Sequence, residues 1–375
     1  MSVSDNFFLC YFETTRRCNL HCSYCMTRRE SNADAAEMTT EEAKTLVLDE
    51  VAAISSNAAI AFSGGEHLLR PDAYELLDYA AKAGIWSFVN TNGRLLVETD
   101  AIAQAVKATG GKVVFALSLN SLDASANSAG RDDAPETVWH AAKLCEEKHA
   151  PFFFIVTVSK GNLATLPETM RFLRKRNVPM LRSPFVPRGA GRAFRQLMAD
   201  RADMEETIHP SLAGNHLSYV SFTPFFGSPD LIKAGASQFG LRIAGVGCQA
   251  ARSFAAVSAE GQVAPCVHLL DSSCACGNAR SERLSEIIRD APLFTALRQR
   301  AGLKGKCGRC RYRQTCGGCR AQAFYHSGDV EGEDPTCFFD PSDSRDRCPL
   351  EAGQTAQLGR FLLYVKTTTP WNSFL

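Results

Sequence analysis

The stretch Cys18-Asn-Leu-His-Cys22-Ser-Tyr-Cys25 places three cysteines on one short segment that follows an apolar run. Three thiolates at this spacing can hold three irons of a [4Fe–4S] cubane and leave the fourth iron without a protein ligand. Zinc is the alternative, but structural zinc prefers four ligands in a closed tetrahedral set, and these three would need His21 in an awkward position. The stretch therefore predicts an iron–sulfur cluster whose open iron can bind a substrate.

Beyond this segment, apolar runs with the length of strands alternate with segments of helical periodicity. The predicted strands cover 8–13, 58–62, 85–90, 112–118, 152–158 and 180–186. The predicted helices cover 40–55, 71–83, 98–108, 134–148 and 166–176. This alternation predicts the α/β class with a parallel sheet and outer helices, as in a partial (β/α)6 barrel of the TIM type. Loops at the C-terminal ends of the strands should then carry the chemistry.

Three short motifs stand at the ends of predicted strands, in order along the chain. Ser-Gly-Gly-Glu ends at Glu66 after the second strand, Asn-Thr-Asn-Gly starts at Asn90 after the third, and Ser-Leu-Asn starts at Ser118 after the fourth. Together with the three-cysteine stretch, in which Tyr24 precedes the last cysteine, they resemble the motifs of the radical S-adenosylmethionine (radical SAM) superfamily. The resemblance covers about residues 7–186.

The resemblance implies a set of contacts with S-adenosylmethionine. The Gly-Gly-Glu backbone and the Glu66 carboxylate would hold the methionine amino group, and Arg131 would pair with the methionine carboxylate. The asparagine and serine side chains at the next strand ends would contact the ribose or the substrate. His67 stands where the family usually has proline. The implied cofactor-binding residues are Gly64, Gly65, Glu66, Asn90, Asn92, Ser118, Asn120 and Arg131, and the implied cluster ligands are Cys18, Cys22 and Cys25.

A second group of cysteines lies in the last third of the chain, where two Cys-x-x-Cys pairs follow a hairpin-like segment at 257–263. The pairs would by themselves allow a zinc ribbon. Their order after the hairpin resembles the SPASM domain, the auxiliary iron–sulfur extension of radical SAM enzymes that act on large or complex substrates. The resemblance assigns an outer cluster to Cys307, Cys310, Cys316 and Cys337, and an inner cluster to Cys248, Cys266 and Cys319.

The inner cluster lacks one ligand of the family pattern. The family usually supplies a further cysteine ahead of the one that matches Cys248, and this chain has none there. The fourth ligand is then Cys274 or Cys276, or the inner cluster keeps an open iron. The cysteines outside the pattern are expected to be small buried side chains; they are Cys10, Cys145 and Cys348.

Composition excludes several other classes of protein. The chain has 375 residues, 41 Lys plus Arg against 40 Asp plus Glu, and 45% hydrophobic residues, which excludes a disordered protein and a broadly basic nucleic-acid coat. Its longest apolar run, 151–158, is shorter than the about 20 residues of a membrane span, and the N-terminus lacks a secretory signal. We expect a cytoplasmic protein whose 15 cysteines mainly ligate metal, without nucleic-acid or membrane partners.

These observations predict a division of the chain into four parts. They are a radical SAM barrel at 1–186, a linker or substrate-covering segment at 187–245, a SPASM domain at 246–350 and a C-terminal tail at 351–375.

The resemblance also implies a reaction type. A low-potential electron donor of the flavodoxin or ferredoxin type would reduce the first [4Fe–4S] cluster, and S-adenosylmethionine would be cleaved to methionine and a 5′-deoxyadenosyl radical. That radical would remove hydrogen from an unactivated C–H bond of the substrate. Two auxiliary clusters would accept an electron from the product radical, which implies a net oxidation such as dehydrogenation, oxidative decarboxylation or cross-linking.

The first substrate class is a carboxylated tetrapyrrole. The segment that starts at Cys316 and ends at Cys337 locally resembles the branch of SPASM proteins that modifies haem and haem d1 precursors. Arginines around the last predicted strand could clamp carboxylates in a bidentate manner, although exposed arginines on a solvated surface are the competing interpretation. These arginines are Arg182, Arg188, Arg192 and Arg195.

Other functions compete with this one. A ribosomally made peptide is the second substrate class, but many maturases carry a leader-binding domain before the barrel, and the first cluster cysteine at position 18 leaves no room for one. An aminosugar or cyclitol is the third class, and it would need an active-site base that the sequence does not nominate. A non-enzymatic iron–sulfur or zinc protein would not need the adenosyl-binding motifs.

Replacing Cys18, Cys22 and Cys25 together with alanine should remove about four irons per chain and leave the C-terminal clusters in place, because a cubane holds four irons. Iron analysis of anaerobically reconstituted protein measures this loss. An unchanged iron content would contradict the assignment of the first cluster.

Overall fold

The computed structural model describes residues 7–28, 36–176, 178, 180–208, 218–220, 247–270, 272–314, 316–339 and 341–342. In this part of the chain, nine strands form one sheet in the order β7-β6-β5-β4-β3-β2-β1-β8-β9. The strands are β1 Phe8–Thr15, β2 Ala58–Gly64, β3 Trp86–Thr91, β4 Val113–Ser118, β5 Phe152–Val158, β6 Met180–Pro184, β7 Ser218–Val220, β8 Phe254–Val257 and β9 Val263–Ala264. All neighbouring strands are parallel except β8 and β9.

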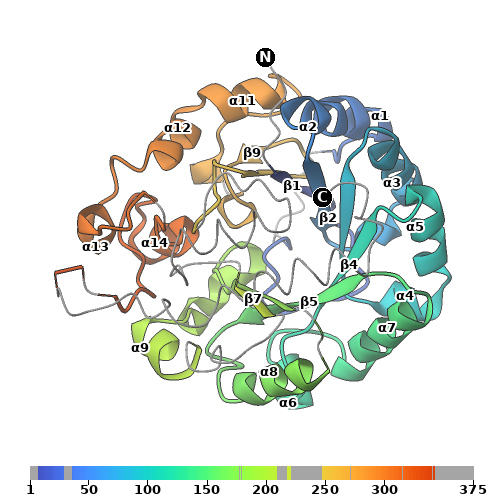
Figure 1. The fold of residues 1–375 in the computed structure, drawn as a ribbon, viewed down its shortest axis with the longest axis horizontal. Helices are drawn as coiled ribbons and strands as arrows, with labels where there is room; N and C mark the ends of the chain where they lie inside the picture. The colour runs from blue at the N-terminus through green and yellow to red at the C-terminus, as the bar shows by residue number, and fades with distance from the viewer. Residues whose placement is uncertain are drawn as a thin grey trace, which may run out of the picture.

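The helices of the barrel follow one another around the outer side of the curved sheet (Figure 1). They are α1 Thr40–Glu42, the π-helical turn η1 Ala43–Leu48, α2 Asp49–Ile54, α3 Ala73–Lys82, α4 Arg94–Glu98, α5 Ala101–Thr109, α6 Ala124–Ser128, α7 Pro135–Glu147 and α8 Leu166–Lys175. Short elements then follow, namely η3 Gly189–Leu197, α9 Arg201–Asp203 and η4 Met204–Ile208. No helix in the described ranges has the length and apolar character needed to span a membrane.

The C-terminal region contributes a second set of helices, drawn in orange and red in Figure 1. They are η6 Val267–Leu269, η7 Ser272–Cys274, α11 Leu284–Asp290, α12 Pro292–Gln299, α13 Gly305–Arg309 and α14 Arg320–Ser327. One further 3-10 turn, η2 His67–Leu69, belongs to the barrel and follows β2.

The fold class is the expected one, and the reason is visible in how the strands are covered. Phe8, Cys10 and Phe12 of β1 join the core beneath the outer helices, whereas Leu9 joins a smaller apolar cluster inside the barrel. Side chains of a strand alternate between its two faces, and both faces of a parallel sheet are covered. The strands are therefore continuous apolar runs in the sequence. The ends of β1–β6 lie within two residues of the predicted ends.

Two details of the barrel differ from the sequence expectation. The helix predicted at 98–108 is present as α5, and an additional helix, α4, precedes it and starts after Gly93, which has φ +85°. The barrel also continues past the predicted sixth strand, since β7 pairs with β6 in parallel.

The hairpin predicted at 257–263 is present, but it is part of the barrel sheet. β8 pairs in parallel with β1, from Leu9 opposite Phe254 to Phe12 opposite Val257, and β9 returns antiparallel to β8. An ion pair between Arg16 and Glu260 holds the turn of this hairpin beside the three-cysteine segment. The cysteine-rich region is therefore joined to the barrel through main-chain pairing.

A buried ion pair strengthens this junction. Glu13 at the end of β1 pairs with Arg188, with Nη1–Oε1 at 2.7 Å and Nη2–Oε2 at 3.2 Å, and the side chains are 3% and 2% exposed. Arg188 also donates hydrogen bonds to the carbonyl oxygens of Val267 and Leu270. One guanidinium thus connects β1, the segment after β6 and the turn that contains η6.

The four arginines considered for a carboxylate clamp have different surroundings in the fold. Arg188 is held by Glu13, and Arg195 donates to the carbonyl oxygens at the end of α14. Arg182 lies on the same face of β6 as Met180, which faces the outer helices, and Arg192 is exposed. The fold uses two of these arginines to attach the C-terminal region.

Arg188→Met should lower the free energy of unfolding by about 3–5 kcal/mol, because it leaves the Glu13 carboxylate buried without its partner. Urea unfolding of the anaerobically purified protein measures the change. The control is Arg201→Met, which removes an exposed pair with Glu205 at 3.9 Å and should cost less than about 1 kcal/mol. Equal effects of the two substitutions would contradict the structural role of Arg188.

Candidate active site

The C-terminal ends of the barrel strands surround a cavity of about 220 Å³. Glu66 lies buried behind the wall of this cavity, where it accepts hydrogen bonds from Thr91 and Asn92. All the other residues predicted for the first cluster and for S-adenosylmethionine line the cavity. They are Cys18, Cys22, Cys25, Gly64, Gly65, Asn90, Asn92, Ser118, Asn120 and Arg131.

The three-cysteine segment is tied to the turn after β2. The Cys25 thiol lies 3.1 Å from the Thr27 hydroxyl, which donates a hydrogen bond to the carbonyl oxygen of Gly64 at 3.0 Å. Burial raises the pKa of the Cys18 thiol to about 11 and also raises the pKa of Cys22, where the charge of Arg131 opposes the effect of burial. A cluster that binds here must therefore displace the thiol protons.

The aromatic residue before the last cysteine has a packing role. The Tyr24 ring packs edge-on against Phe185, with ring centroids 5.2 Å apart. It also occupies the space beside Gly130, where an added Cβ would lie 1.5 Å from the ring. Gly130 was not singled out from the sequence, since no local pattern distinguishes it from another loop glycine.

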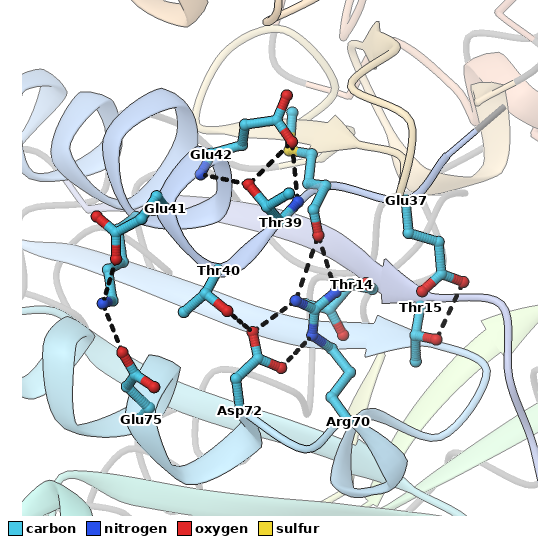
Figure 2. Close-up of polar contacts among 12 residues, drawn as sticks. Thr14, Thr15, Glu37, Thr39, Thr40, Glu41, Glu42, Arg70, Asp72 and Glu75 are labelled. Atoms are coloured by element: carbon cyan, nitrogen blue, oxygen red, sulfur yellow. Dashed lines mark hydrogen bonds and ion pairs between the residues drawn. The ribbon is translucent and has the colours of Figure 1, made fainter.

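The chain that leads into the cysteine segment is fixed by a polar network, which Figure 2 shows. Arg70 pairs with Asp72 and donates to the carbonyl oxygen of Thr14 at 2.7 Å. Glu37 accepts hydrogen bonds from the Thr15 hydroxyl at 3.1 Å and from the backbone N–H of Arg16 at 2.7 Å. These bonds hold the end of β1 directly before the first cluster cysteine.

The two glycines of the Gly-Gly-Glu motif allow the turn after β2 to approach the end of β1. Gly64 has φ +111°, and a Cβ on Gly65 would lie 2.1 Å from the carbonyl oxygen of Arg17. The backbone N–H of Gly65 donates to Thr15 at 2.7 Å, and that of Glu66 donates to Arg17 at 2.8 Å. Larger side chains at these positions would separate the turn from the cysteine segment.

Glu66 has one carboxylate oxygen that is paired and one that is not. Oε2 accepts hydrogen bonds from the Thr91 hydroxyl and the Asn92 backbone N–H, both at 3.0 Å. Oε1 is buried and accepts no hydrogen bond of regular geometry from the described residues. Burial raises the pKa of this carboxyl to about 7. A buried acceptor without a donor is unfavourable, so the residue fits a ligand that brings a cationic donor, such as the ammonium of S-adenosylmethionine.

The histidine that replaces the usual proline of the family is a buried packing residue. His67 Nδ1 lies 2.9 Å from the Thr14 hydroxyl, and the ring stacks on Phe62 with centroids 4.6 Å apart. Burial lowers the pKa of His67 to about 3. The neutral imidazole links β1 and β2, and Glu66 Oε2 keeps its contacts with Thr91 and Asn92 beside it.

Arg131 faces the cavity with an acidic partner that the sequence analysis did not identify. Its Nε and Nη2 bind the two carboxylate oxygens of Asp133 at 2.7 and 2.6 Å, and both side chains are less than 10% exposed. Nη1 takes no part in this ion pair. The pairing of Arg131 with the methionine carboxylate stays a prediction, and Asp133 would orient the guanidinium for it.

The asparagines of the strand-end motifs are connected to their neighbours. Asn90 donates to the Ser63 hydroxyl at 3.3 Å, and Asn92 donates to Asn19 at 2.8 Å. Asn120 donates to the hydroxyl of Tyr24. The contacts of these side chains with the ribose of S-adenosylmethionine or with the substrate stay predictions.

The four cysteines assigned to the outer cluster line a second cavity, together with Tyr312 and Phe339. Backbone N–H groups point at three of the sulfurs at 3.4 Å, those of Cys307, Cys310 and Cys316. Hydrogen bonds of this kind favour the thiolate form and influence the potential of an iron–sulfur cluster. This donor set fits the auxiliary cluster that the SPASM resemblance implies.

Arg320 is a further residue of the outer site that the sequence analysis missed. It is 3% exposed, and its Nη2 lies 3.5 Å from the Cys307 sulfur. Its other nitrogens donate to carbonyl oxygens of the surrounding loops, including that of Gly332 at 2.7 Å. The residue directly follows Cys319 in sequence, which is the only signal that could have pointed to it.

The three cysteines assigned to the inner cluster are neighbours. Burial raises the pKa of Cys266 to about 12, with a further contribution from Cys248. The pKa of Cys319 is raised by burial, by the charge of Asp334 and by both of these thiols. Cys276 lies beside Cys274, since its thiol contacts the Cys274 carbonyl oxygen at 3.4 Å. The choice between these two as the fourth ligand, or an open iron, stays a prediction.

The remaining cysteines are placed as far as the structure describes them. Cys10 and Cys145 are fully buried in the apolar core beneath the helices. Cys348 lies outside the described residues. Among the described side chains, no three Cys, His, Asp or Glu converge closely enough to coordinate a single metal ion. The predicted ligands of the first and outer clusters line the two cavities described above.

Comparison with known proteins agrees with this geometry. The family model of the radical SAM superfamily matches residues 12–173, and that of the SPASM iron–sulfur cluster-binding domain matches residues 248–320. An AdoMet-dependent heme synthase of Methanosarcina barkeri is 32% identical over 346 residues, which are 88% of this chain and 96% of that protein. The chain belongs to the radical SAM superfamily.

Other relatives of this radical SAM protein act on peptides. A PqqA peptide cyclase of Gluconobacter oxydans is 29% identical, over 89% of this chain and 91% of that protein. The crystal structure of Streptococcus suis SuiB bound to S-adenosylmethionine matches with a TM-score of 0.63 at 18% identity, covering 90% of this chain and 78% of SuiB. This last likeness concerns the fold.

Glu66→Gln should weaken binding of S-adenosylmethionine by roughly 1.5–3 kcal/mol, because it removes a charge-assisted hydrogen bond. In the unaltered protein, binding should also weaken as the pH falls through about 7, since the carboxyl pKa is about 7 and the carboxylate is the form that attracts an ammonium. The variant should lack this pH dependence. Anaerobic calorimetry measures both effects, and iron content serves as the control. Equal affinities in cluster-loaded proteins would leave Glu66 as a turn residue only.

Proposed function

We propose that this radical SAM enzyme oxidatively modifies a carboxylated tetrapyrrole. The observation that carries the proposal is the similarity to a heme synthase, which is 32% identical and extends over both the barrel and the cysteine-rich region. Similarity over both parts matters because the substrate chamber is built from both.

Part of the cavity wall is apolar, which supports the proposal of a substrate with an apolar surface. The side chains that β5, β6, the residues after β6 and the η6 turn contribute to this wall are mainly apolar. Ligand sites of this kind combine apolar walls with a few placed polar groups. The apolar residues of this wall are Ile155, Leu181, Pro184, Phe185, Val186 and Val267.

We assign the following tasks to the chain's residues. When bound, S-adenosylmethionine and a reduced iron–sulfur cluster supply the radical that removes hydrogen from the substrate. Cys18, Cys22 and Cys25 would hold the cluster, and Glu66 would orient the methionine end of the cofactor. The apolar wall would exclude water and direct the target hydrogen, which protects a reactive intermediate from side reactions.

The auxiliary cysteines would hold two further [4Fe–4S] clusters that serve the oxidation of the product radical. Peptide and small-molecule radical SAM proteins need a reductant, and we propose a flavodoxin- or ferredoxin-type carrier for this chain. Oxidative decarboxylation of a propionate side chain to a vinyl group is the favoured reaction, because it removes carbon dioxide and two hydrogens and is therefore a net oxidation.

Peptide modification is the second candidate. It is favoured by the 29% identity to a PqqA peptide cyclase over most of both chains. The two candidates differ in substrate and share the residues assigned to radical formation.

Anaerobically reconstituted protein with a flavodoxin reductant, S-adenosylmethionine and Fe-coproporphyrin III should release 5′-deoxyadenosine and a porphyrin that has lost carbon dioxide and two hydrogens per reacted side chain. Mass spectrometry measures both products. Cys316→Ala should retain slow 5′-deoxyadenosine formation and give little porphyrin product, provided that circular dichroism shows a folded variant. Cofactor cleavage with an unaltered porphyrin would reject the tetrapyrrole substrate, and a mass shift of a peptide would favour the second candidate.

A further inference from the structure

Two polar side chains meet inside the apolar part of the cavity wall. Ser183 of β6 and His268 of η6 lie 85 residues apart in sequence, and the Ser183 hydroxyl is 3.3 Å from His268 Nε2. Both residues line the cavity. His268 is 4% exposed, so it is almost fully shielded from bulk solvent although it lines the cavity.

The position of His268 is determined by contacts that no local sequence pattern contains. Arg188 donates to the carbonyl oxygens of Val267 and Leu270 on either side of the histidine, while its guanidinium is paired with Glu13. On the β6 side, Gln322 of α14 donates a hydrogen bond to the carbonyl oxygen of Phe185 at 2.9 Å. Phe185 follows Ser183 by two residues. Both partners of the pair are therefore held by buried polar contacts.

The cavity contains few charged groups for a substrate carboxylate. Among the described residues that line it, Arg131 is the one arginine or lysine, and Asp133 already binds two of its nitrogens. Arg131 is also the residue predicted for the methionine carboxylate. A carboxylate at the apolar end would have to be bound by hydrogen-bond donors that are not cationic side chains.

We propose that Ser183 and His268 form a substrate subsite in which the C-terminal region binds a carboxylate of an otherwise apolar substrate. The hydroxyl and an imidazole N–H would donate to the carboxylate oxygens, while the surrounding apolar residues contact the ring system. Hydrogen bonds to a charged group are stronger than neutral ones, especially where water is excluded. The subsite rests on the proposed tetrapyrrole function, since a propionate is the carboxylate that such a substrate offers.

The test measures binding of Fe-coproporphyrin III to the reconstituted, cluster-loaded protein by the change in porphyrin absorbance. Ser183→Ala and His268→Ala should each weaken binding about tenfold, which corresponds to about 1.4 kcal/mol. The double variant should lose less than the product of the two single effects, because both residues contact one carboxylate. His268→Gln, which keeps a side-chain N–H donor, should recover part of the affinity.

Three controls separate a binding role from a structural one. His140→Ala changes an exposed histidine of α7 and should bind the porphyrin as the unaltered protein does. Iron content must stay unchanged in the His268 variants, because Cys266 lies two residues away. Uncoupled cleavage of S-adenosylmethionine, measured without porphyrin, should also stay unchanged, since neither residue is among those predicted to hold the first cluster or the cofactor.

The outcomes distinguish the subsite from the function on which it rests. If the unaltered protein binds and converts the porphyrin and the Ser183 and His268 variants bind it equally well, the subsite is wrong and the function stands. If the variants lose affinity only together with iron, His268 is a structural residue and the subsite is wrong. If the unaltered protein neither binds nor converts the porphyrin, both proposals fail.

Discussion

The ion pair between Glu13 and Arg188 is the contact on which the architecture of the cavity depends. A buried ion pair must offset a large loss of hydration, and this one does so with two carboxylate contacts and two further hydrogen bonds to carbonyl oxygens. Those carbonyls belong to Val267 and Leu270, which flank the histidine on the cavity wall. The pair therefore attaches the C-terminal region to the barrel at the point where the two share a cavity.

Glu13 and Glu66 show how position decides what a buried carboxylate does. Both stand at or just beyond the end of a neighbouring barrel strand and are almost fully buried. Glu13 is paired on both oxygens, which suits a structural group, whereas Glu66 keeps one oxygen without a regular donor and has a pKa raised to about 7. A perturbed carboxyl beside a cavity is the expected property of a ligand-binding group.

The surroundings of the cysteines likewise decide what each of them does. Those in the core beneath the helices are enclosed by apolar side chains and have a pKa raised by burial, as Cys10 shows. In the outer site, three of the four sulfurs receive backbone N–H groups, and Arg320 adds a cationic donor. Burial raises the pKa of Cys307 and Cys310, and the backbone N–H groups and nearby arginines oppose part of that rise, which favours loss of the thiol protons to metal.

The role expected of Glu66 came from the resemblance to a family, whereas the sequence by itself determined the six parallel strands and the three-cysteine segment. These features are local, because a strand buried on both faces leaves a continuous apolar run, and cluster ligands on one loop leave a fixed spacing. Cysteines distributed over separate elements could also be assigned, but only through their resemblance to a family, and the fourth inner ligand stays open.

The tertiary structure decided which distant groups meet. It placed β8 beside β1, paired Arg188 with Glu13 across 175 residues, and brought His268 to Ser183. The arginines after β6 looked alike in sequence, yet one became an anchor inside the protein and another stayed exposed. The physical reason is that the local sequence around a short strand or a single arginine does not specify its distant partner. The packing of the whole sheet selects that partner.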